Sequence, residues 1–450
     1  MDTKITVPLE GTQSKSQAKM AAVLSALWMG LGQLFNRQIG KGLLFFAAGI
    51  FEMVFIFTSL GEKVHGLITL GEHPGQIQKV DGIYQMVPGD HSIFLMLEGV
   101  IALFVLILFL SLHYASVKDA YRVAKEMEEG KSPNRFAATL ANLKDRNFVY
   151  VLLFLPIIAT LFFTVLPIVF SVLLAFTNFS APRNIPPAGL VNWVGFQTFI
   201  DLFTMKAWSQ TFFGVAAWTV VWAVSATVTC YFGGILLAVL INQEGIRFKK
   251  FWRTVMIIPW AIPAFVSLLI MRNIYNGQFG PINQYLKMLG FEAIPWLTDP
   301  MLAKFTVIFV NMWVGIPVTM VLVTGVLASI PKELYEAADM DGATSIQKFW
   351  KITMPMILFA TAPLLIMQFA GNINNFNVIF LLTDGNPPVA GYQSAGGTDL
   401  LITWLYKLTL QQNQFNMASA IGILIFIFIS VFSIVNYRRT RSFKEEDMIQ

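Results

Sequence analysis

Long apolar runs constrain this chain more than any other feature of its sequence. A helix that crosses a bilayer needs about 20 mostly apolar residues, at a rise of about 1.5 Å per residue. Eight stretches meet this requirement, at approximately residues 41–60, 92–117, 148–177, 210–241, 252–274, 303–328, 355–382 and 415–437. The sequence therefore predicts an all-α fold, that of a polytopic membrane protein with about eight transmembrane helices.

The composition agrees with this class. Of 450 residues, 56% are hydrophobic and 13% are charged, whereas soluble domains carry about 25% charged residues. The single cysteine, Cys230, lies in an apolar run, so we expect a buried thiol and no intrachain disulfide. The apolar run at 20–35 has no clear cleavage pattern, which predicts an interfacial or re-entrant helix rather than a signal peptide.

The distribution of basic residues predicts the orientation. With a cytoplasmic N-terminus, 23 of the 31 Lys and Arg residues fall in inside segments and six fall in outside loops. Cytoplasmic loops carry the excess of Lys and Arg in membrane proteins. We therefore expect both termini in the cytoplasm.

Three parts follow from the positions of the spans. Residues 1–147 form an N-terminal segment, two spans and a cytoplasmic linker, in which 118–147 is expected to form cytoplasmic helices. Residues 148–437 form a six-helix core, and 438–450 form a cytoplasmic tail. The tail opens on an Arg-rich cluster that suits anionic lipid headgroups.

The loop between the sixth and seventh spans has a helix-turn-helix pattern. Ser329 and Pro331 are helix start signals, and Gly342 can adopt the left-handed conformation that ends a helix. Three alanines leave a low surface that another protein can approach, and Glu336 and Asp341 supply charge at its edge. From these residues alone, a docking element and an ordinary connector remain equal alternatives.

The same loop resembles the EAA loop of permeases from ATP-binding-cassette (ABC) importers. The match consists of Glu-Ala-Ala, Asp-Gly-Ala and the later Phe349, Ile352 and Pro355, within the loop 330–355. The resemblance implies a type I importer permease whose first loop helix docks into an ATPase subunit. The implied coupling residues are Glu336, Ala337, Ala338, Asp341, Gly342 and Ala343.

Enzymatic motifs are missing from the sequence. No G-x-x-x-x-G-K-[S/T] phosphate loop occurs, so ATP and Mg²⁺ are expected on a separate ATPase subunit and no cofactor on this chain. The four histidines lack metal-ligand spacing, and we expect neither catalytic residues nor a metal site. Nothing in the sequence indicates a nucleic-acid partner.

The seventh span is unusually rich in amides. Four of its residues recur at helical i, i+3, i+4 and i+7 spacing and so share one face: Gln368, Gly371, Asn372 and Asn375. Each buried amide needs hydrogen-bonding partners in a membrane. Sugar hydroxyls and neighbouring helices are equally good partners, so a substrate site and a packing role both remain open.

The last six spans also resemble the MalF-type permeases of maltose and maltodextrin importers. The similarity includes Ala175–Phe179, the run from Asn374 through Pro387, and Thr398–Leu401. It implies a mid-membrane sugar site at Val314, Gly315, Val318, Gln368, Gly371, Asn372 and Asn375. It also implies a second homologous permease, two ATPase subunits and an extracellular or periplasmic sugar-binding protein as partners.

Two departures from that family bear on the substrate. Gly371 and Val318 stand where the type member has aromatic residues, and Trp313 or Phe376 would have to replace them, although core packing suits both better. The loop at 178–209 is too short for the large folded domain of the type member. A permease for another oligosaccharide or for glycerol phosphate is therefore an alternative.

Charges within the spans suggest a rival from another class. Glu52 and Glu98 lie in or at the ends of the first two spans, where a central charge costs about 2.5–3.5 kcal/mol. An ion-coupled secondary transporter would use such groups, but pairing at the N-terminal helix interface or the headgroups is the favoured role. The second alternative to an importer is a membrane scaffold, in which the amides of the seventh span serve only to pack helices together.

Overall fold

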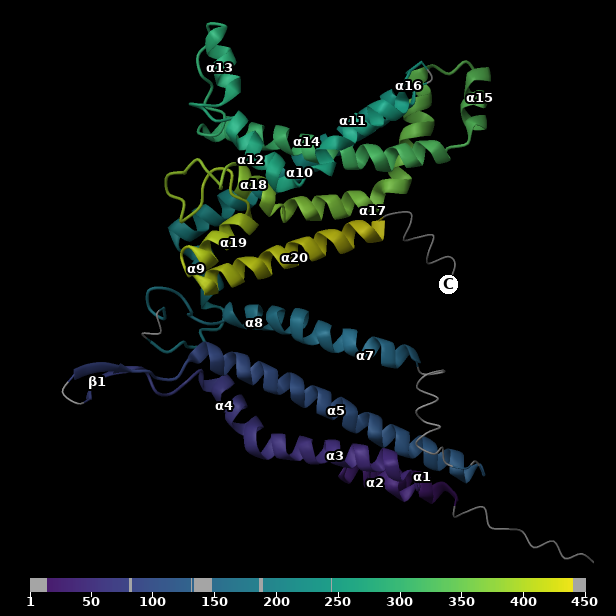
Figure 1. The fold of residues 1–450 in the computed structure, drawn as a ribbon, viewed down its shortest axis with the longest axis vertical. Helices are drawn as coiled ribbons and strands as arrows, with labels where there is room; N and C mark the ends of the chain where they lie inside the picture. The colour runs from purple at the N-terminus through teal and green to yellow at the C-terminus, as the bar shows by residue number, and fades with distance from the viewer. Residues whose placement is uncertain are drawn as a thin grey trace, which may run out of the picture. The chain divides into compact units, whose positions relative to one another are not determined.

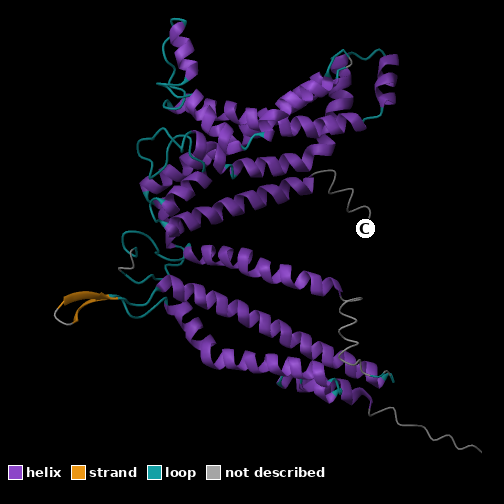
Figure 2. Ribbon diagram, in the orientation of Figure 1, coloured by secondary structure: helices purple, strands orange, loops and turns teal. Residues whose placement is uncertain are grey.

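The structure, a computed structural model, describes residues 14–80, 83–130, 132, 148–185, 189–243 and 245–439. Within these residues nearly all regular structure is helical, which confirms the predicted all-α class (Figure 2). The chain divides into two compact units, Met1–Trp193 and Val194–Gln450. The first compact unit includes the third predicted span, because α8 (Leu166–Leu174) of that span contacts α5 (Ser92–Glu128). The predicted boundary at residue 148 stays a prediction.

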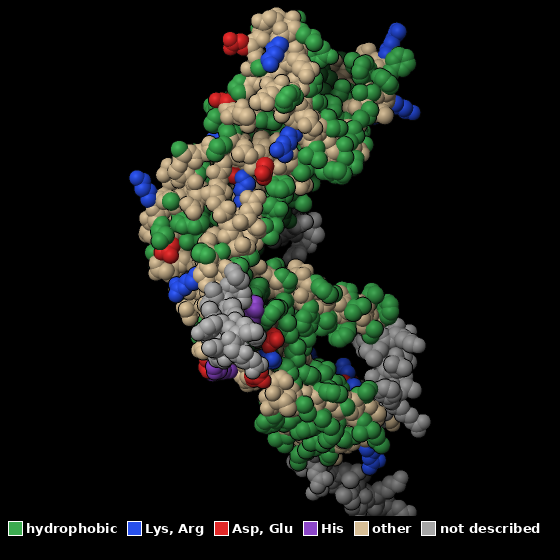
Figure 3. Space-filling view, turned by 60° about the vertical axis from the view of Figure 1, so that its left-hand side comes forward, with side chains coloured by type: hydrophobic (Ala, Val, Ile, Leu, Met, Phe, Trp, Pro, Cys, Tyr) green, Lys and Arg blue, Asp and Glu red, His purple; other side chains and the backbone are tan. Residues whose placement is uncertain are grey.

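Seven helices of the described chain are long and apolar enough to cross a membrane, and a bent pair makes eight if it counts as one span. The seven are Ile39–Thr69, Ser92–Glu128, Phe148–Leu174, Lys206–Asn242, Pro300–Ser329, Ser345–Leu382 and Phe415–Arg438. Each overlaps one predicted stretch, and the bent pair overlaps the remaining one. On the face drawn in Figure 3, hydrophobic side chains cover much of the helical surface.

The first unit is built around α5 (Ser92–Glu128), which α3 (Ile39–Phe55) and α4 (Gly61–Thr69) accompany (Figure 1). A π-helical turn at Ile56–Leu60 joins α3 to α4. Two short helices, α1 (Ser14–Leu27) and α2 (Leu31–Phe35), pack on α5 in place of the single helix predicted at 20–35.

The end of α5 and the helix after it complete the unit. Because α5 runs to Glu128, residues 118–128 continue the second span instead of forming a separate helix. The rest of the predicted linker, apart from residues 129, 130 and 132, lies outside the described residues, as does the tail beyond residue 439. The third span consists of α7 (Phe148–Thr160), a π-turn at Leu161–Val165, and α8 (Leu166–Leu174).

The two intramembrane glutamates are paired within this unit. Glu52 Oε2 lies 3.1 Å from His113 Nδ1, and His113 Nε2 lies 3.0 Å from the Ser25 carbonyl oxygen. Glu98 Oε2 accepts a hydrogen bond from Lys63 Nζ at 2.7 Å. These contacts join neighbouring helices, which is the packing role that we favoured over ion coupling.

An antiparallel hairpin between the first two spans was not predicted. Strand β1 (Gln76–Val80) pairs with β2 (Ile83–Val87), with Gln76 opposite Val87. Asp90 joins the two ends of the hairpin. Its Oδ2 accepts hydrogen bonds from the backbone N–H groups of Glu72 and His73 at 2.8 and 2.9 Å. These donors lower the pKa of the Asp90 carboxyl. Two five-residue strands are too short to stand out against the long apolar runs.

The second unit is arranged around α10 (Lys206–Asn242), which contacts helices from most of the unit. Its neighbours in space are α9 (Gln197–Thr204), α11 (Lys249–Ala261), α14 (Pro300–Ser329), α17 (Met354–Ile373) and α19 (Leu401–Leu410). The last helix, α20 (Phe415–Arg439), packs on α9, α17 and α19. Trp222 and Trp404 are fully buried at the centre of this arrangement.

The fifth span is bent rather than straight. Helix α11 ends at Ala261, α12 (Ala264–Ile274) begins after two intervening residues, and their axes differ by 88°. Ile262 has an extended backbone with ψ 133°, because the ring of Pro263 disfavours a helical conformation in the residue before it. The predicted span at 252–274 therefore consists of two helices that meet at a bend.

A buried ion pair holds the loop at residues 383–400. Asp399 is fully buried and its Oδ2 lies 2.8 Å from Lys407 Nζ on α19. Asp399 also accepts hydrogen bonds from the Gly396 N–H at 2.7 Å and from the Thr403 hydroxyl at 2.8 Å. Burial raises the pKa of the Asp399 carboxyl, and the Lys407 ammonium opposes this rise.

Removing one partner of this pair tests its contribution to stability. We expect Lys407→Met to cost roughly 3–5 kcal/mol, because it leaves the Asp399 carboxylate buried without its counter-ion. Thermal unfolding of the full chain in detergent measures the loss. The double variant Asp399→Asn/Lys407→Met should recover most of it, and equal melting temperatures for wild type and Lys407→Met would contradict the assignment.

Candidate functional site

A polar pocket lies at mid-length of the second unit's long helices. It has a volume of about 300 Å³ and is lined by Cys230, Trp260, Ala264, Leu268, Asn311, Val314, Gly315, Val318, Gln368, Asn372, Asn375, Asn377 and Val378. These residues come from α10, α11, α12, α14, α17 and α18 (Phe376–Leu382). Six of the seven predicted substrate residues therefore share one cavity, which is called the amide pocket below.

The seventh span is broken beside the amide pocket. Helix α17 ends at Ile373 and α18 begins at Phe376, so Asn375 lies in the break and not on a continuous helix. The Asn375 side chain caps α18 by accepting a hydrogen bond from the Val378 N–H at 3.4 Å. The prediction that the residues from Gln368 to Asn375 share one face of a continuous helix was therefore wrong. Three of the four predicted residues, all except Gly371, do line the pocket.

Hydrogen bonds fix the position of Asn372. Its side-chain Nδ2 donates a hydrogen bond to the Thr227 hydroxyl on α10 at 2.9 Å. Its backbone carbonyl oxygen accepts a hydrogen bond from Trp222 Nε1 at 3.0 Å. Asn375 Nδ2 lies 3.4 Å from Asn372 Oδ1 and 3.5 Å from Asn311 Oδ1. Interhelical packing and a polar lining are therefore roles of the same side chains.

Seven of the thirteen lining residues were missed by sequence reasoning, among them Asn311 and Trp260. Asn311 is an amide within a predicted span, and the cost of burying an amide would have identified it. Trp260 supplies the aromatic surface that neither Gly371 nor Val318 provides, but it comes from the bent fifth span. No local signal connects it to the pocket, because the 88° bend brings it there.

Phe376 and Trp313 do not line this pocket in the described chain. Phe376 packs against Phe380 and Tyr406, with ring centroids 4.8 and 4.9 Å apart. Its role is therefore packing, as the sequence favoured.

The two glycines of the predicted site have different surroundings. A Cβ at Gly315 would lie 2.5 Å from Cys230 Sγ, so this glycine permits the close approach of α14 to α10. A Cβ at Gly371 would have no atom within 4 Å. Gly371 is the one predicted substrate residue that is absent from the pocket lining.

The loop at 330–355, called the coupling loop below after its predicted role, has the predicted helix-turn-helix geometry (Figure 1). Helix α15 (Lys332–Met340) ends in a turn where Gly342 adopts a φ of +73°, and α16 (Ser345–Lys348) follows. Thr344 and Gln347 form a capping box at the start of α16. A π-helical turn at Phe349–Thr353 continues α16 directly into α17.

Two side-chain contacts make the loop a rigid unit. The Tyr335 hydroxyl lies 2.8 Å from the Thr353 hydroxyl, and Lys348 Nζ lies 2.6 Å from Asp339 Oδ1. Four of the predicted coupling residues are exposed, namely Glu336, Ala337, Asp341 and Gly342, and the other two, Ala338 and Ala343, are half-buried. Apolar side chains are exposed beside them at Leu334, Met340, Ile346 and Trp350.

Comparison with known proteins decides the family. The model of the family described as "Binding-protein-dependent transport system inner membrane component" matches residues 230–442, which include the amide pocket's polar residues and the coupling loop. The galactooligosaccharides transport system permease protein GanP of Bacillus subtilis is 39% identical over 96% of this chain and 100% of its own. This chain belongs to that family.

Two further comparisons agree with this membership. The maltodextrin permease MdxF of B. subtilis is 36% identical over 96% of this permease and 98% of its own chain. A chain of a bacterial alginate ABC transporter, solved with a pentasaccharide-bound periplasmic protein, has a TM-score of 0.55. It is 24% identical and covers 67% of this permease and 97% of that chain, which shows the shared fold. The predicted MalF-type resemblance is confirmed.

The two glycines of the permease provide a matched pair for testing the helix contact. Gly315→Ala should destabilise the protein by about 1–3 kcal/mol, because the new methyl group overpacks against Cys230. Gly371→Ala should have little effect. Thermal unfolding in detergent measures both.

A compensating variant separates this contact from a general effect of alanine. Cys230→Ala/Gly315→Ala should lose less stability than Gly315→Ala alone, because the sulfur that the methyl group meets is removed. Equal losses in the single and double variants would contradict the contact.

Proposed function

We propose that this permease moves a neutral oligosaccharide built of hexose units, of the maltodextrin or galactooligosaccharide type, into the cell. The observation that carries the proposal is the amide pocket, whose lining combines four asparagines and a glutamine with one tryptophan and contains no charged side chain among the described residues. Amides donate to and accept from hydroxyl groups, and an aromatic ring suits the apolar face of a sugar.

The relatives support the same substrate class. One is named for transport of galactooligosaccharides and another for transport of maltodextrin, at 39% and 36% identity. Maltose is therefore one candidate among related sugars. Glycerol phosphate is disfavoured, because a phosphate group favours cationic partners and the amide pocket lining includes none.

The proposed mechanism is alternating access driven by a separate ATPase. Two ATPase subunits that bind ATP and Mg²⁺ dock on α15 and the turn at Gly342, and their closure moves α17 through the continuous segment Phe349–Thr353. A second homologous permease completes the cavity, and an extracellular or periplasmic binding protein delivers the sugar. Both termini and the coupling loop face the cytoplasm in this arrangement.

The ion-coupled alternative finds less support. Glu52 and Glu98 contact His113 and Lys63 within the first unit. The amide pocket is lined by residues of the second unit and holds no acidic side chain among the described residues. An ion-coupled carrier would need a titratable group beside its substrate.

Replacement of a pocket amide tests the substrate site. Asn375→Leu should lower uptake of maltose, maltodextrins or raffinose by at least about tenfold, because sugar hydroxyls lose their partner in a buried site. Uptake by the assembled complex in proteoliposomes, with each sugar and its binding protein, measures the effect and the substrate range.

Asn374→Leu is the matched control. Asn374 is an exposed neighbour that does not line the pocket, so its replacement should leave uptake near the wild-type rate. Unchanged uptake in Asn375→Leu would leave the amides with a packing role only.

The turn at Gly342 tests the coupling. Gly342→Val should abolish sugar-stimulated ATP hydrolysis and uptake, because a β-branched residue is strained at a φ of +73° and the turn between α15 and α16 must change. ATPase activity and uptake of the reconstituted complex are the measurements.

Gly290 offers a control with the same backbone constraint. It has a φ of +84° and, like Gly342, no atom within 4 Å of an added Cβ, but it lies in the loop before α14. We expect Gly290→Val to keep ATPase coupling. Wild-type ATPase activity and uptake in Gly342→Val would contradict the coupling role proposed for this loop.

A further inference from the structure

The connector between the bent fifth span and α14 lies at the end of the second unit opposite the coupling loop (Figure 1). It runs from Ile274, where α12 ends, to Pro300, where α14 begins, and it contains the helix α13 (Pro281–Met288). Figure 1 shows α13 running across the direction of α14, α17 and α20. The proposed transport cycle uses no residue of this helix.

Two neighbouring faces of α13 differ in chemistry. Tyr285, Met288 and Leu289 follow each other at i, i+3 and i+4 spacing and so share one face, which is called the apolar stripe below. These three residues are 67%, 79% and 73% exposed. The face beside the stripe carries Gln284 and Lys287, which are also exposed. An apolar face next to a polar one is typical of a helix that lies in a membrane surface.

A buried asparagine fixes α13 to both ends of the connector. The Asn283 side chain is fully buried, and its Nδ2 donates to the carbonyl oxygens of Gly277 and Ile294 at 2.9 and 2.8 Å. Its Oδ1 accepts from the Ile294 N–H at 3.1 Å and from Trp296 Nε1 at 3.0 Å. The apolar stripe is therefore held on a fixed scaffold rather than on a loose loop.

The connector is also attached to the two spans that it joins. The Trp296 carbonyl oxygen accepts a hydrogen bond at 3.1 Å from the Thr306 hydroxyl, in the second turn of α14. The Trp296 ring lies 5.7 Å from the ring of Tyr275, the residue after α12. The connector thus folds back against the helix ends, which sets the level of α13 relative to the spans.

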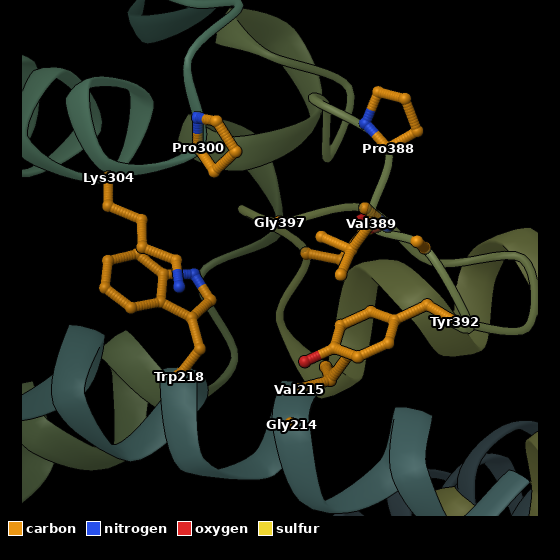
Figure 4. A pocket seen from close by; sticks show the side chains of 12 residues that line it. Gly214, Val215, Trp218, Pro300, Lys304, Pro388, Val389, Tyr392 and Gly397 are labelled. Atoms are coloured by element: carbon orange, nitrogen blue, oxygen red, sulfur yellow. The ribbon is translucent and has the colours of Figure 1, made fainter. Parts of the chain in front are cut away.

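A cavity beside the first turns of α14 shows where polar groups replace the apolar surface of the span (Figure 4). Its volume is about 360 Å³, and Lys304 Nζ lies 4.8 Å from the centroid of the Trp218 ring at its wall. The Tyr392 hydroxyl points into the same space. Lysine, tryptophan and tyrosine gather at the headgroup level of a bilayer. Because Thr306 is only two residues beyond Lys304, the connector is attached at that level.

We propose that α13 lies on the membrane surface opposite the coupling loop, with the apolar stripe inserted between lipid headgroups and the upper acyl chains. A face that meets a soluble partner only transiently spends the remaining time in water, where an apolar stripe is costly, whereas lipid covers it permanently. The one charged residue of α13, Lys287, borders the stripe and suits a lipid phosphate. The contact anchors the junction of two spans that line the amide pocket.

Spin labelling of the assembled complex tests this placement. Cys230→Ala removes the single cysteine of the sequence, and Met288→Cys then carries a nitroxide label while the partner subunits carry no cysteine. The complex is placed in vesicles of phosphatidylethanolamine and phosphatidylglycerol. The label should collide with dissolved oxygen several-fold more often than with a water-soluble nickel chelate, because oxygen concentrates among acyl chains and the chelate stays in water.

Lys287→Cys is the matched control. This neighbour belongs to the polar face, so its label should collide more often with the nickel chelate than with oxygen. Leu289→Cys repeats the test on the apolar stripe if the complex with Met288→Cys does not assemble. Adding Asn283→Ala should make the label at position 288 more mobile and lower its oxygen-to-nickel ratio, because α13 loses its attachment to the connector.

Three results would overturn the proposal. Equal collision ratios at positions 288 and 287 would place the apolar stripe in water. Low collision rates with both reagents at position 288 would place the stripe against a protein, and a ratio that changes only after the binding protein is added would identify that protein as the partner. None of these results depends on the sugar that is moved, so uptake by the same vesicles tests the proposed function separately.

Discussion

Close contact between α10 and α14 underlies the organisation of the second unit. Gly315 faces Cys230 across this contact, and the absence of a side chain at Gly315 lets the two helices approach. In a membrane there is little hydrophobic driving force between helices, so close packing of small residues and interhelical hydrogen bonds hold them together. The amide pocket lies along this helix pair, and both helices contribute residues to its lining.

Two helix breaks border the amide pocket. The fifth span bends at Pro263 and brings Trp260 to the pocket, while the seventh span stops at Ile373 and restarts after Asn375. Irregular backbone at membrane depth needs protein or water as its partner. The break at Asn375 meets this need through its side-chain cap and its contacts with Asn311 and Asn372.

A continuous path of structure links the coupling loop to the amide pocket. Helix α16, the π-turn at Phe349–Thr353 and α17 follow each other without a loop, and α17 carries Gln368 and Asn372. A displacement of the loop is thus transmitted along a helix rather than through a flexible connector. The Tyr335–Thr353 contact ties α15 to the same segment.

The sequence by itself determined the spans, the turn at Gly342 and the polar character of the seventh span. These features are local: a bilayer requires about 20 apolar residues in a row, and a left-handed turn favours glycine. Only the tertiary structure decided that Trp260 and Asn311 join Asn375, that Gly371 stays outside the pocket, and that Lys304 meets Trp218. These contacts join residues far apart in the chain, and they depend on a bend, a helix break and a close crossing that no local pattern specifies.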